Sequence, residues 1–307
     1  MHLLCQIFSV RVKFLLKAIL SHRIETNSLQ FLYLLFITKF TCVKSFKNKT
    51  VWITGASSGI GEYLAGAFAR EGAKVIISSH EPEELERVKN ELAPVTTDVY
   101  VVPFNLAKPE EVQSAANRVL NEFGGVDVLM NNGGISQRSL AAETPVSLDR
   151  LIMEIDYFAG IILVKAVLPG MIERGEGYFG ITSTIAGKFG FPMRSAYSAA
   201  KHALFGFYES LLAENHKHGI RVTLFSPGRV RTNISKNAVD KDGKERGVMD
   251  PGQANGIPPE KCAKKMVRSM KRGRKDVLIG GGELAMVYVY KYARWLYYRV
   301  ARRMSPY

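Results

Sequence analysis

The sequence has few cysteines, and their spacing gives them no structural role. Three occur among 307 residues, at Cys5, Cys42 and Cys262, and no two of them form a CxxC pair. A disulfide framework or a zinc site needs several cysteines at short, regular spacings, so neither is expected. The sequence therefore predicts a reducing compartment or inert buried thiols, and no metal site.

Long hydrophobic runs are also absent. A membrane-spanning helix needs about 20 mostly apolar residues, and the runs at 8–20, 29–38 and 40–43 are too short or are broken by basic residues. A secretory signal is not evident, because no unbroken apolar core leads to a small-residue cleavage site. Residues 1–47 are interpreted as a separate hydrophobic and basic extension. This extension is either a membrane anchor or interfacial helix, or a segment that packs against the core.

Acidic residues are scarce at both ends of the chain. Lys and Arg number 42 against 28 Asp and Glu, which gives a formal charge of +14. Residues 1–50 carry eight basic side chains and one acidic, and residues 261–307 carry thirteen and two, so the middle of the chain is mildly acidic. Both basic ends are rich in aliphatic and aromatic residues, and no nucleic-acid-binding module is evident. The pattern favours contact with an anionic membrane surface over nucleic acid.

From residue 48 onward, short apolar runs alternate with helical patterns, as in successive βαβ units. The runs are almost wholly apolar, which suits a parallel sheet covered by helices on both faces. The length and the 47% hydrophobic content favour one large core. The predicted strands are 50–53, 74–79, 99–103, 126–130, 178–183, 220–226 and 276–279, and the predicted helices are 59–70, 81–92, 109–123, 149–173, 195–217 and 258–271.

A glycine-rich turn, TGASSGIG at residues 54–61, directly follows the first predicted strand. Gly55 can take a tight turn, Gly59 lets the backbone approach a pyrophosphate, and Gly61 lets the next helix pack on the strand. A plain turn is the alternative, but the position between the first strand and a helix predicts a dinucleotide site. The predicted contacts in this turn are Thr54, Gly55, Ser57, Ser58, Gly59, Ile60 and Gly61.

A tyrosine and a lysine stand four residues apart in YSAAK, at Tyr197 and Lys201. On a helix both side chains project from one face. A nearby cation stabilises a phenolate, so such a phenol can exchange a proton at neutral pH as a general acid or base. The spacing also arises by chance on amphipathic helices, and it becomes informative only together with the glycine-rich turn.

Together these motifs resemble the short-chain dehydrogenase/reductase family over residues 48–277. The matching segments are the turn at 54–61, NNGG at 131–134, the Tyr–Lys pair, and SPG at 226–228 with Thr232. The stretch SAYSAAKHA at 195–203 looks like the member 7 group of that family, whose enzymes are membrane-associated and act on lipophilic carbonyls or alcohols. The resemblance implies an α/β fold: a Rossmann-type doubly wound sheet of seven parallel strands, in the order 3-2-1-4-5-6-7, within a three-layer αβα sandwich over residues 48–281.

The resemblance also implies the catalytic roles. Tyr197 would exchange a proton with the substrate oxygen while a hydride moves between substrate and nicotinamide, and Lys201 would hold the nicotinamide ribose. The family's substrate-binding Ser is replaced by Thr184, with Ser183 as a substitute if the strand register shifts by one residue. The family's helix-borne Asn is replaced by Asp156, whose carboxylate can pair with Lys201 and hinder proton relay.

Cofactor choice depends on the end of the second strand. Ser79 stands where an NAD enzyme of this family has an acid, and His80 stands where phosphate-binding relatives often have Arg. This predicts NADP(H) more strongly than NAD(H). Asn105 replaces the family's adenine-contacting Asp. The other implied cofactor contacts are Leu106, Asn132, Gly133, Pro227, Gly228, Val230 and Thr232, with Tyr197 and Lys201 at the nicotinamide end.

Three segments remain open to two interpretations. Residues 232–258 form either a solvated loop or a substrate lid. Phe189, Phe191 and Met193 either wall an apolar pocket or pack in the core. Residues 282–307 contain one amphipathic helix, predicted over 284–304, with six Tyr or Trp residues and several basic ones. An in-plane membrane helix is favoured there over a dimer helix.

The predicted function is that of an NAD(P)(H)-dependent carbonyl reductase or alcohol dehydrogenase, EC 1.1.1.-, for a steroid-, retinoid- or lipid-like substrate. The alternative is a catalytically weak relative that binds nucleotide and acts as a membrane-bound partner or sensor. The expected location is the endoplasmic reticulum membrane, with the cytoplasm as the alternative. A homodimer or homotetramer is expected, and no nucleic-acid partner.

Overall fold

The computed structural model describes residue 43 and residues 45–303. By its contacts the chain divides into residues 1–41 and residues 42–307. The predicted anchor in residues 1–47 lies mostly outside the described residues and stays a prediction. Among the residues that are described, no helix has both the length and the apolar content to span a bilayer.

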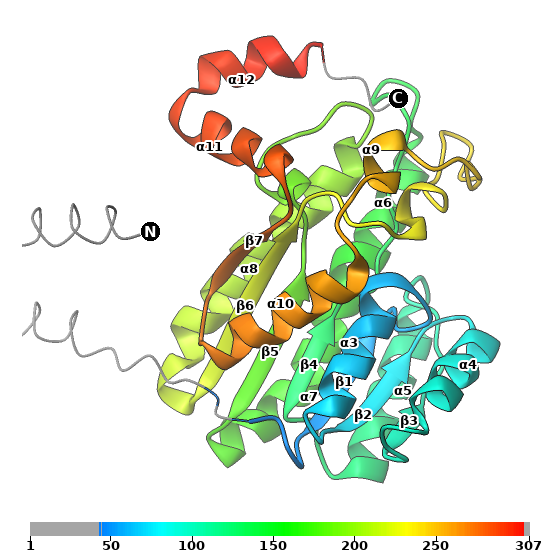
Figure 1. Cartoon of the computed structure of the whole chain (residues 1–307), viewed down its shortest axis with the longest axis vertical. Coiled ribbons are helices and arrows are strands. Elements are labelled where there is room, and N and C mark those ends of the chain that lie inside the picture. Colours follow the sequence, from blue (N-terminus) through cyan, green and yellow to red (C-terminus); the bar gives the residue numbers. More distant parts are fainter. Residues whose placement is uncertain (1–42, 44, 304–307) are drawn as a thin grey trace, which may run out of the picture. The chain divides into compact units, whose positions relative to one another are not determined.

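Seven parallel strands form one sheet in the order β3-β2-β1-β4-β5-β6-β7, which confirms the predicted fold (Figure 1). The order reverses between β1 and β4, where Ile53 is in register with Met130. Crevices at the carboxyl ends of strands form at such a reversal. The strands are β1 (Thr50–Thr54), β2 (Lys74–Ser78), β3 (Val99–Val101), β4 (Val128–Asn131), β5 (Gly177–Thr182), β6 (Ile220–Pro227) and β7 (Asp276–Ile279).

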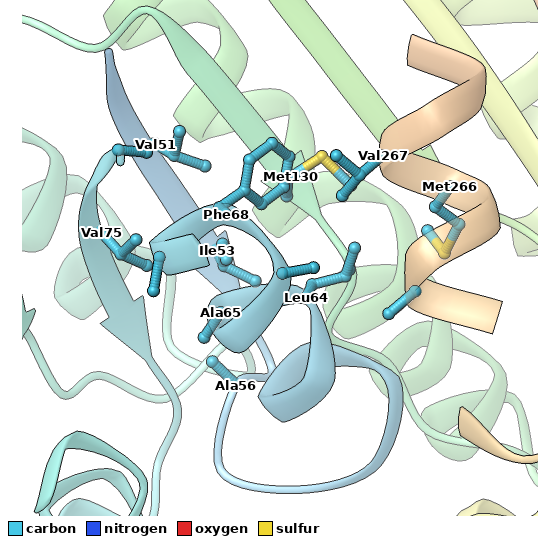
Figure 2. Close-up of a cluster of buried hydrophobic side chains, with 14 of the residues drawn as sticks. Val51, Ile53, Ala56, Leu64, Ala65, Phe68, Val75, Met130, Met266 and Val267 are labelled. Carbon is cyan, nitrogen blue, oxygen red and sulfur yellow. The ribbon is translucent and has the colours of Figure 1, made fainter. Parts of the chain in front are cut away.

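Helices cover both faces of the sheet because the strand side chains alternate between two apolar clusters. In β1, Val51 and Ile53 belong to one cluster and Trp52 to the other. Figure 2 shows the first cluster, where Phe68 and Leu64 meet Met266 and Val267. The first face carries α3 (Gly59–Arg70), α4 (Pro82–Leu92) and α10 (Pro259–Lys271); the second carries α5 (Pro109–Phe123), α7 (Ala159–Arg174) and α8 (Ser195–Asn215).

Two predicted helices are interrupted in the structure. The helix predicted over 149–173 consists of α6 (Val146–Met153), one π-helical turn (Glu154–Phe158) and α7. The single helix predicted over 284–304 is instead a pair, α11 (Ala285–Tyr292) and α12 (Arg294–Ala301).

The break in the C-terminal pair lies at Ala293, whose φ of −139° and ψ of 58° are not helical. It allows both Tyr290 and Tyr297 to pack on Phe189, at ring-centroid distances of 6.0 and 5.3 Å. The sequence periodicity could not reveal this, because the packing partner lies about a hundred residues away. The remaining short elements are α9 (Pro251–Ala254) and 3₁₀ turns at Ile185–Gly187, His216–His218, Asn233–Ser235 and Gly282–Leu284.

The compact unit that contains the sheet begins before residue 48. Phe46 is 1% exposed and packs edge-to-face on Phe68 of α3, with ring centroids 5.1 Å apart. The boundary predicted after residue 47 therefore falls inside the compact unit, because a large aromatic side chain fills the first core cluster there.

We expect Phe46→Ala to lower the free energy of unfolding by about 3–5 kcal/mol, because truncating a buried Phe loses transfer energy and leaves a cavity. Phe158→Ala is the matched control, because Phe158 is 47% exposed, and its cost should stay below about 1 kcal/mol. Urea denaturation of the purified variants measures both. Equal effects would show that residues 43–47 are not part of the core.

Candidate active site

The turn at residues 54–61 brings the ends of β1 and β4 unusually close. Gly55 has a φ of +63°, and a Cβ atom on it would lie 2.6 Å from the Gly133 Cα. A Cβ atom on Gly61 would lie 2.0 Å from the Gly55 carbonyl oxygen. Neither position can hold a side chain, so glycine is required for the turn to pack against both α3 and the residues after β4.

Hydrogen bonds fix this contact. The Thr54 hydroxyl oxygen accepts from the backbone amides of Asn132 and Gly133, each at 3.1 Å. The Asn132 side-chain amide donates to the Thr54 and Gly55 carbonyls, both at 3.2 Å. The Thr182 hydroxyl on β5 then donates to the side-chain oxygen of Asn132, Oδ1, at 3.0 Å. Three neighbouring strands are thus joined at their carboxyl ends, which holds the glycine-rich backbone in a fixed position.

A cleft of about 420 Å³ opens over these strand ends, a size typical of small-molecule sites. The helix α3 begins at its edge, and the free backbone amides of such a helix end can bind an anion. Of the predicted cofactor contacts, the following line the cleft: Thr54, Gly55, Ser57, Ser58, Gly59, Ile60, Ser79, His80, Asn105, Leu106, Asn132, Gly133 and Thr232.

Other predicted contacts lie outside this lining. Gly61 packs behind the turn, and Val230 is 2% exposed in the first core cluster. Gly228 donates its backbone amide to the Ile279 carbonyl and lies against the Glu283 carboxylate. Pro227 ends β6, and its carbonyl accepts from the Thr184 hydroxyl.

The end of β2 holds an acid to which the sequence reasoning gave no role. The Ser57 hydroxyl donates to the Glu81 carboxylate at 2.6 Å, and the Glu81 amide donates to the Ser79 hydroxyl at 3.2 Å. The family has its acid at the position of Ser79, and Glu81 stands two residues after it. The family pattern therefore does not point to Glu81. His80 is exposed between them. The hydroxyls of Ser57 and Ser79 and the Glu81 carboxylate therefore form one polar corner of the cleft.

Tyr197 and Lys201 lie together in the first half of α8. Both are buried, with exposures of 5% and 4%, and the Lys201 ammonium lies 5.8 Å from the centroid of the Tyr197 ring. The same ammonium donates to the Thr182 carbonyl at 3.4 Å. The structure thus connects Lys201 to the cleft residue Thr182, although neither Tyr197 nor Lys201 lines the cleft itself.

Asp156 is drawn into this arrangement by the π-helical turn. Its Oδ2 atom lies 3.4 Å from the Lys201 ammonium, and its Oδ1 atom accepts from the Ile135 amide at 2.7 Å. Burial raises the pKa of the Asp156 carboxyl above its usual range, and Lys201 and the Ile135 amide oppose that rise. Gly134 permits the contact, since a Cβ atom there would lie 2.8 Å from Asp156 Oδ1.

Beside this pair lies a cavity of about 10 Å³, lined by Asp156, Lys201, Thr182 and Asn131 among others. Asp156 Oδ2 and Asn131 Oδ1 are buried and have no hydrogen-bond partner among the described residues. A polar cavity of this volume has room for about one water molecule. In the sequence Asn131 is marked only by its place in the NNGG motif, which gives no sign of this cavity.

The two hydroxyls considered for substrate binding have different surroundings. The Ser183 hydroxyl is buried and donates to the Lys201 carbonyl at 3.1 Å, so it holds the backbone of α8. The Thr184 hydroxyl donates to the Pro227 carbonyl at 3.2 Å and accepts from the Ala186 amide at 3.4 Å.

Part of the segment 232–258 lies packed against the Tyr–Lys region. Val239 is 8% exposed and belongs to the same apolar cluster as Tyr197. Its amide and carbonyl bond to the Ser136 carbonyl and the Arg138 amide at 2.9 and 2.8 Å. Asp250 is buried and ion-paired with Arg138 at 2.5 Å. These contacts make the part of the segment around Val239 a packed cover over Tyr197, whereas residues 241–245 are exposed.

A second arginine also reaches Asp250. Arg194 Nη2 lies 3.3 Å from Asp250 Oδ2. Burial and the neighbouring Arg138 lower the pKa of Arg194 to about 10, against an opposing effect of Tyr197 and Asp250.

Phe189, Phe191 and Met193 do not line the cleft. Phe189 is fully buried, and its ring packs on Phe191 and on Tyr297 of α12. Met193 has a φ of +60°, and its carbonyl accepts from the Ser139 amide. For Phe189, core packing is therefore the interpretation that the contacts favour. Among the described residues no cluster could hold a metal ion.

A nucleotide-sized cleft at the reversal point of a parallel sheet, with a buried Tyr and Lys beside it, defines a Rossmann-type oxidoreductase. A family model described as short chain dehydrogenase matches residues 49–243. The chain belongs to this short-chain dehydrogenase/reductase family, which confirms the resemblance seen in its motifs.

The chain is also similar to individual members of the family and to solved structures. The chain is 40% identical over 253 residues to a dehydrogenase/reductase SDR family protein 7-like of Drosophila melanogaster, covering 80% of this chain and 78% of that one. Among solved structures, an SDR from Burkholderia phymatum in complex with NAD matches with a TM-score of 0.73 at 21% identity, over 86% and 98% of the two chains. An alcohol dehydrogenase from Thermococcus sibiricus complexed with 5-hydroxy-NADP matches with a TM-score of 0.65 at 24% identity, over 77% and 97%.

We expect the difference in stability between the wild type and Asp156→Asn to depend on pH. A carboxyl in an unfolded chain has a pKa of about 4. As the pH rises from that value, the wild type should lose stability relative to the variant. The folded-state pKa of Asp156 is raised, so the folded state binds more protons between the two pKa values and loses that advantage as the pH rises. Thermal unfolding midpoints across pH 4 to 8 measure the difference. Asp242→Asn, at an exposed position, is the control, and parallel curves for wild type and Asp156→Asn would contradict the prediction.

Proposed function

We propose that this chain is an NAD(P)(H)-dependent carbonyl reductase or alcohol dehydrogenase, EC 1.1.1.-, that acts on a lipophilic substrate. The observation that carries the proposal is the burial of Tyr197 beside Lys201, next to a cleft whose lining cannot hold a side chain at Gly55. A buried phenol next to a cation is an expensive arrangement for packing alone, and it is a suitable proton donor.

The residues of the cleft fit a nicotinamide dinucleotide. The backbone of residues 54–61 and the amino end of α3 would hold its pyrophosphate, and Asn105 with Leu106 would face its adenine end. Lys201 would hold the nicotinamide ribose. When bound, the nicotinamide supplies or accepts the hydride.

Tyr197 then moves the proton. In the reductive direction its phenol donates to the substrate oxygen, and the nearby Lys201 ammonium stabilises the phenolate that remains. The proton can be restored to Tyr197 through Lys201 and the small polar cavity beside Asp156. Each step uses a group that is already buried and held, which avoids reorganisation during the reaction.

We assign to Thr184 the role of hydrogen-bonding to the substrate oxygen. A hydroxyl has one donor hydrogen, and in this structure Thr184 gives it to the Pro227 carbonyl. Binding a carbonyl substrate would therefore require the Thr184 hydroxyl to turn away from Pro227. Its extra methyl group restricts χ1 more than in a Ser, so the Thr184 oxygen has less freedom to move toward a substrate, and the proposed site is expected to work more slowly than one with Ser.

A lipophilic substrate is supported by the side chains at the Tyr197 side of the cleft. They are apolar and come from segments that follow β4, from the α6 region and from the cover over Tyr197. A steroid-, retinoid- or lipid-like molecule could pack against them. These side chains are Ile135, Leu151, Ile155, Ile234 and Val239.

Membrane association through the termini is part of the proposal, with the endoplasmic reticulum as the expected location and the cytoplasm as the alternative. On α11 and α12, Tyr292 and Trp295 are 74% and 64% exposed. Lys291 and Arg299 lie over these two rings, at 5.2 and 5.6 Å from the centroids. Exposed aromatic rings beside cations suit the lipid interface. A homodimer or homotetramer stays a prediction.

The second candidate function is a catalytically weak nucleotide-binding relative that serves as a membrane-bound partner or sensor. The ion pair between Asp156 and Lys201 favours it, because a carboxylate 3.4 Å away holds the lysine proton in place.

We expect turnover of a panel of ketones and retinals with NADPH or NADH to fall at least about 100-fold in Tyr197→Phe, since general acid–base groups contribute about 10²–10⁴-fold. Cofactor binding should be unchanged, and Tyr63→Phe, at an exposed tyrosine, is the control. Asp156→Asn should turn over faster than wild type at neutral pH. Cofactor binding without any Tyr197-dependent turnover would favour the second candidate function.

For the cofactor, we propose NADP(H) over NAD(H), with His80 as the cationic contact to the 2′-phosphate and Glu81 as an opposing charge. Glu81→Gln should lower the KM for NADPH about fivefold, since one charge pair is worth roughly 1 kcal/mol in water at contact distance. His80→Ala should raise it, and NADH should change little. Glu83→Gln, on the exposed side of α4, is the control. A lower KM for NADH than for NADPH in the wild type would refute the preference.

A further inference from the structure

A groove of about 610 Å³ lies away from the active site, between α3 and α10. These helices run side by side on one face of the sheet (Figure 1). The groove involves their carboxyl-terminal turns, which precede β2 and β7, so it lies toward the amino ends of the strands, whereas the cofactor cleft lies at the carboxyl ends. Its lining is Val43, Ala67, Arg70, Glu71, Lys264, Val267, Arg268, Lys271 and Arg272.

The groove is strongly cationic, with five basic side chains and one acidic. Lys271 pairs with Glu71 at 2.8 Å, and Lys264 pairs with a neighbour on its own helix, Glu260, also at 2.8 Å. Within the described part of the chain, no ion pair or hydrogen bond engages the guanidinium groups of the remaining three. These are Arg70, Arg268 and Arg272.

The groove also has apolar side chains between its cations. Ala67 and Val267 come from the two helices, and Val43 contributes a third aliphatic side chain. An arginine binds a phosphate through two parallel N–H groups, which suits a head group better than a point charge would. Ala67 and Val267 are 9% and 5% exposed and Val43 is half-buried, so this apolar floor offers only a small area to the glycerol and upper acyl carbons that adjoin a lipid phosphate.

The sequence upstream supports a lipid over an internal occupant. Val43 lies at the groove, and the apolar runs 29–38 and 40–43 lead directly to it. Residues 1–50 carry eight basic side chains against one acidic, so this extension cannot neutralise a cationic groove. An external anion fits the charge of the groove better than this extension does.

We propose that the groove between α3 and α10 binds the phosphate groups of anionic phospholipids and holds this face of the catalytic domain against a bilayer. The proposal rests on the membrane association proposed above, but it assigns the contact to side chains of α3 and α10, which lie outside α11, α12 and the active site. Each basic side chain near an anionic surface contributes about 1 kcal/mol, so two reversed charges should be readily measured.

The test is co-flotation of the full chain with phosphatidylcholine vesicles, with and without phosphatidylserine, at low and high salt. Arg268→Glu/Arg272→Glu is expected to partition onto the serine-containing vesicles at least about tenfold less than wild type. Lys165→Glu/Lys217→Glu is the matched control, with the same charge change at exposed positions on the α7 and α8 face. It should partition like the wild type.

A second measurement covers the case in which the N-terminal extension alone keeps every variant on the vesicles. Hydrogen exchange of peptides from α10 should slow on serine-containing vesicles but not on pure phosphatidylcholine, and the groove variant should lose this protection. The variant Tyr292→Ser/Trp295→Ser measures separately how much α11 and α12 contribute to vesicle binding. Turnover of soluble carbonyls should be equal in all variants, so loss of activity is not confused with loss of binding.

Three results would overturn the proposal. They are unprotected α10 in the wild type, an equal effect of the groove and control variants, or tighter binding of the groove to single-stranded RNA than to phosphatidylserine vesicles.

Discussion

The close approach of β1 to β4 is the constraint on which the rest of the site depends. The Gly55 backbone lies against Gly133, and the Thr54 hydroxyl and the Asn132 amide hold the two strand ends together. Without this contact α3 could not begin at the cleft, and its free amides would not face the pyrophosphate position. The reversal of strand order opens the crevice, and the absence of side chains on the glycines leaves room for a backbone-to-phosphate approach.

The same rigid edge explains the electrostatics of the Tyr–Lys pair. Thr182 bonds to Asn132 on one side and accepts from Lys201 on the other, so the ammonium is fixed relative to the cleft. Asp156 is brought beside it by a π-helical turn, a feature that often marks functional sites. Burying a carboxylate and an ammonium together carries a desolvation penalty. Here the buried pair is Asp156 and Lys201, and Lys201 is the group through which a proton would have to move. Under the proposed function, this arrangement keeps the proton donor in place and slows the relay of protons through Lys201.

The two ends of the chain meet the domain at opposite ends of the sheet. Phe46 enters the core just before β1, and β7 leads the chain to α11 beyond the carboxyl ends of the strands. The basic groove adjoins the entry point, whereas the C-terminal helices pack on Phe189 near the active site. Basic and apolar composition alone made the two ends look equivalent. Their places in the fold give them different neighbours, so the contribution of each end to membrane binding can be tested separately.

The sequence by itself determined the order of elements, the nucleotide turn and the Tyr197–Lys201 pair, because these follow from local periodicity and short spacings. All seven strands and most helices fall within a few residues of their predicted bounds. Only the tertiary structure decided the break at Ala293, the contact between Asp156 and Lys201, and the corner formed by Ser57 and Glu81. Each depends on side chains that are far apart in the sequence, or on a local distortion that packing imposes, and neither leaves a periodic signal in the chain.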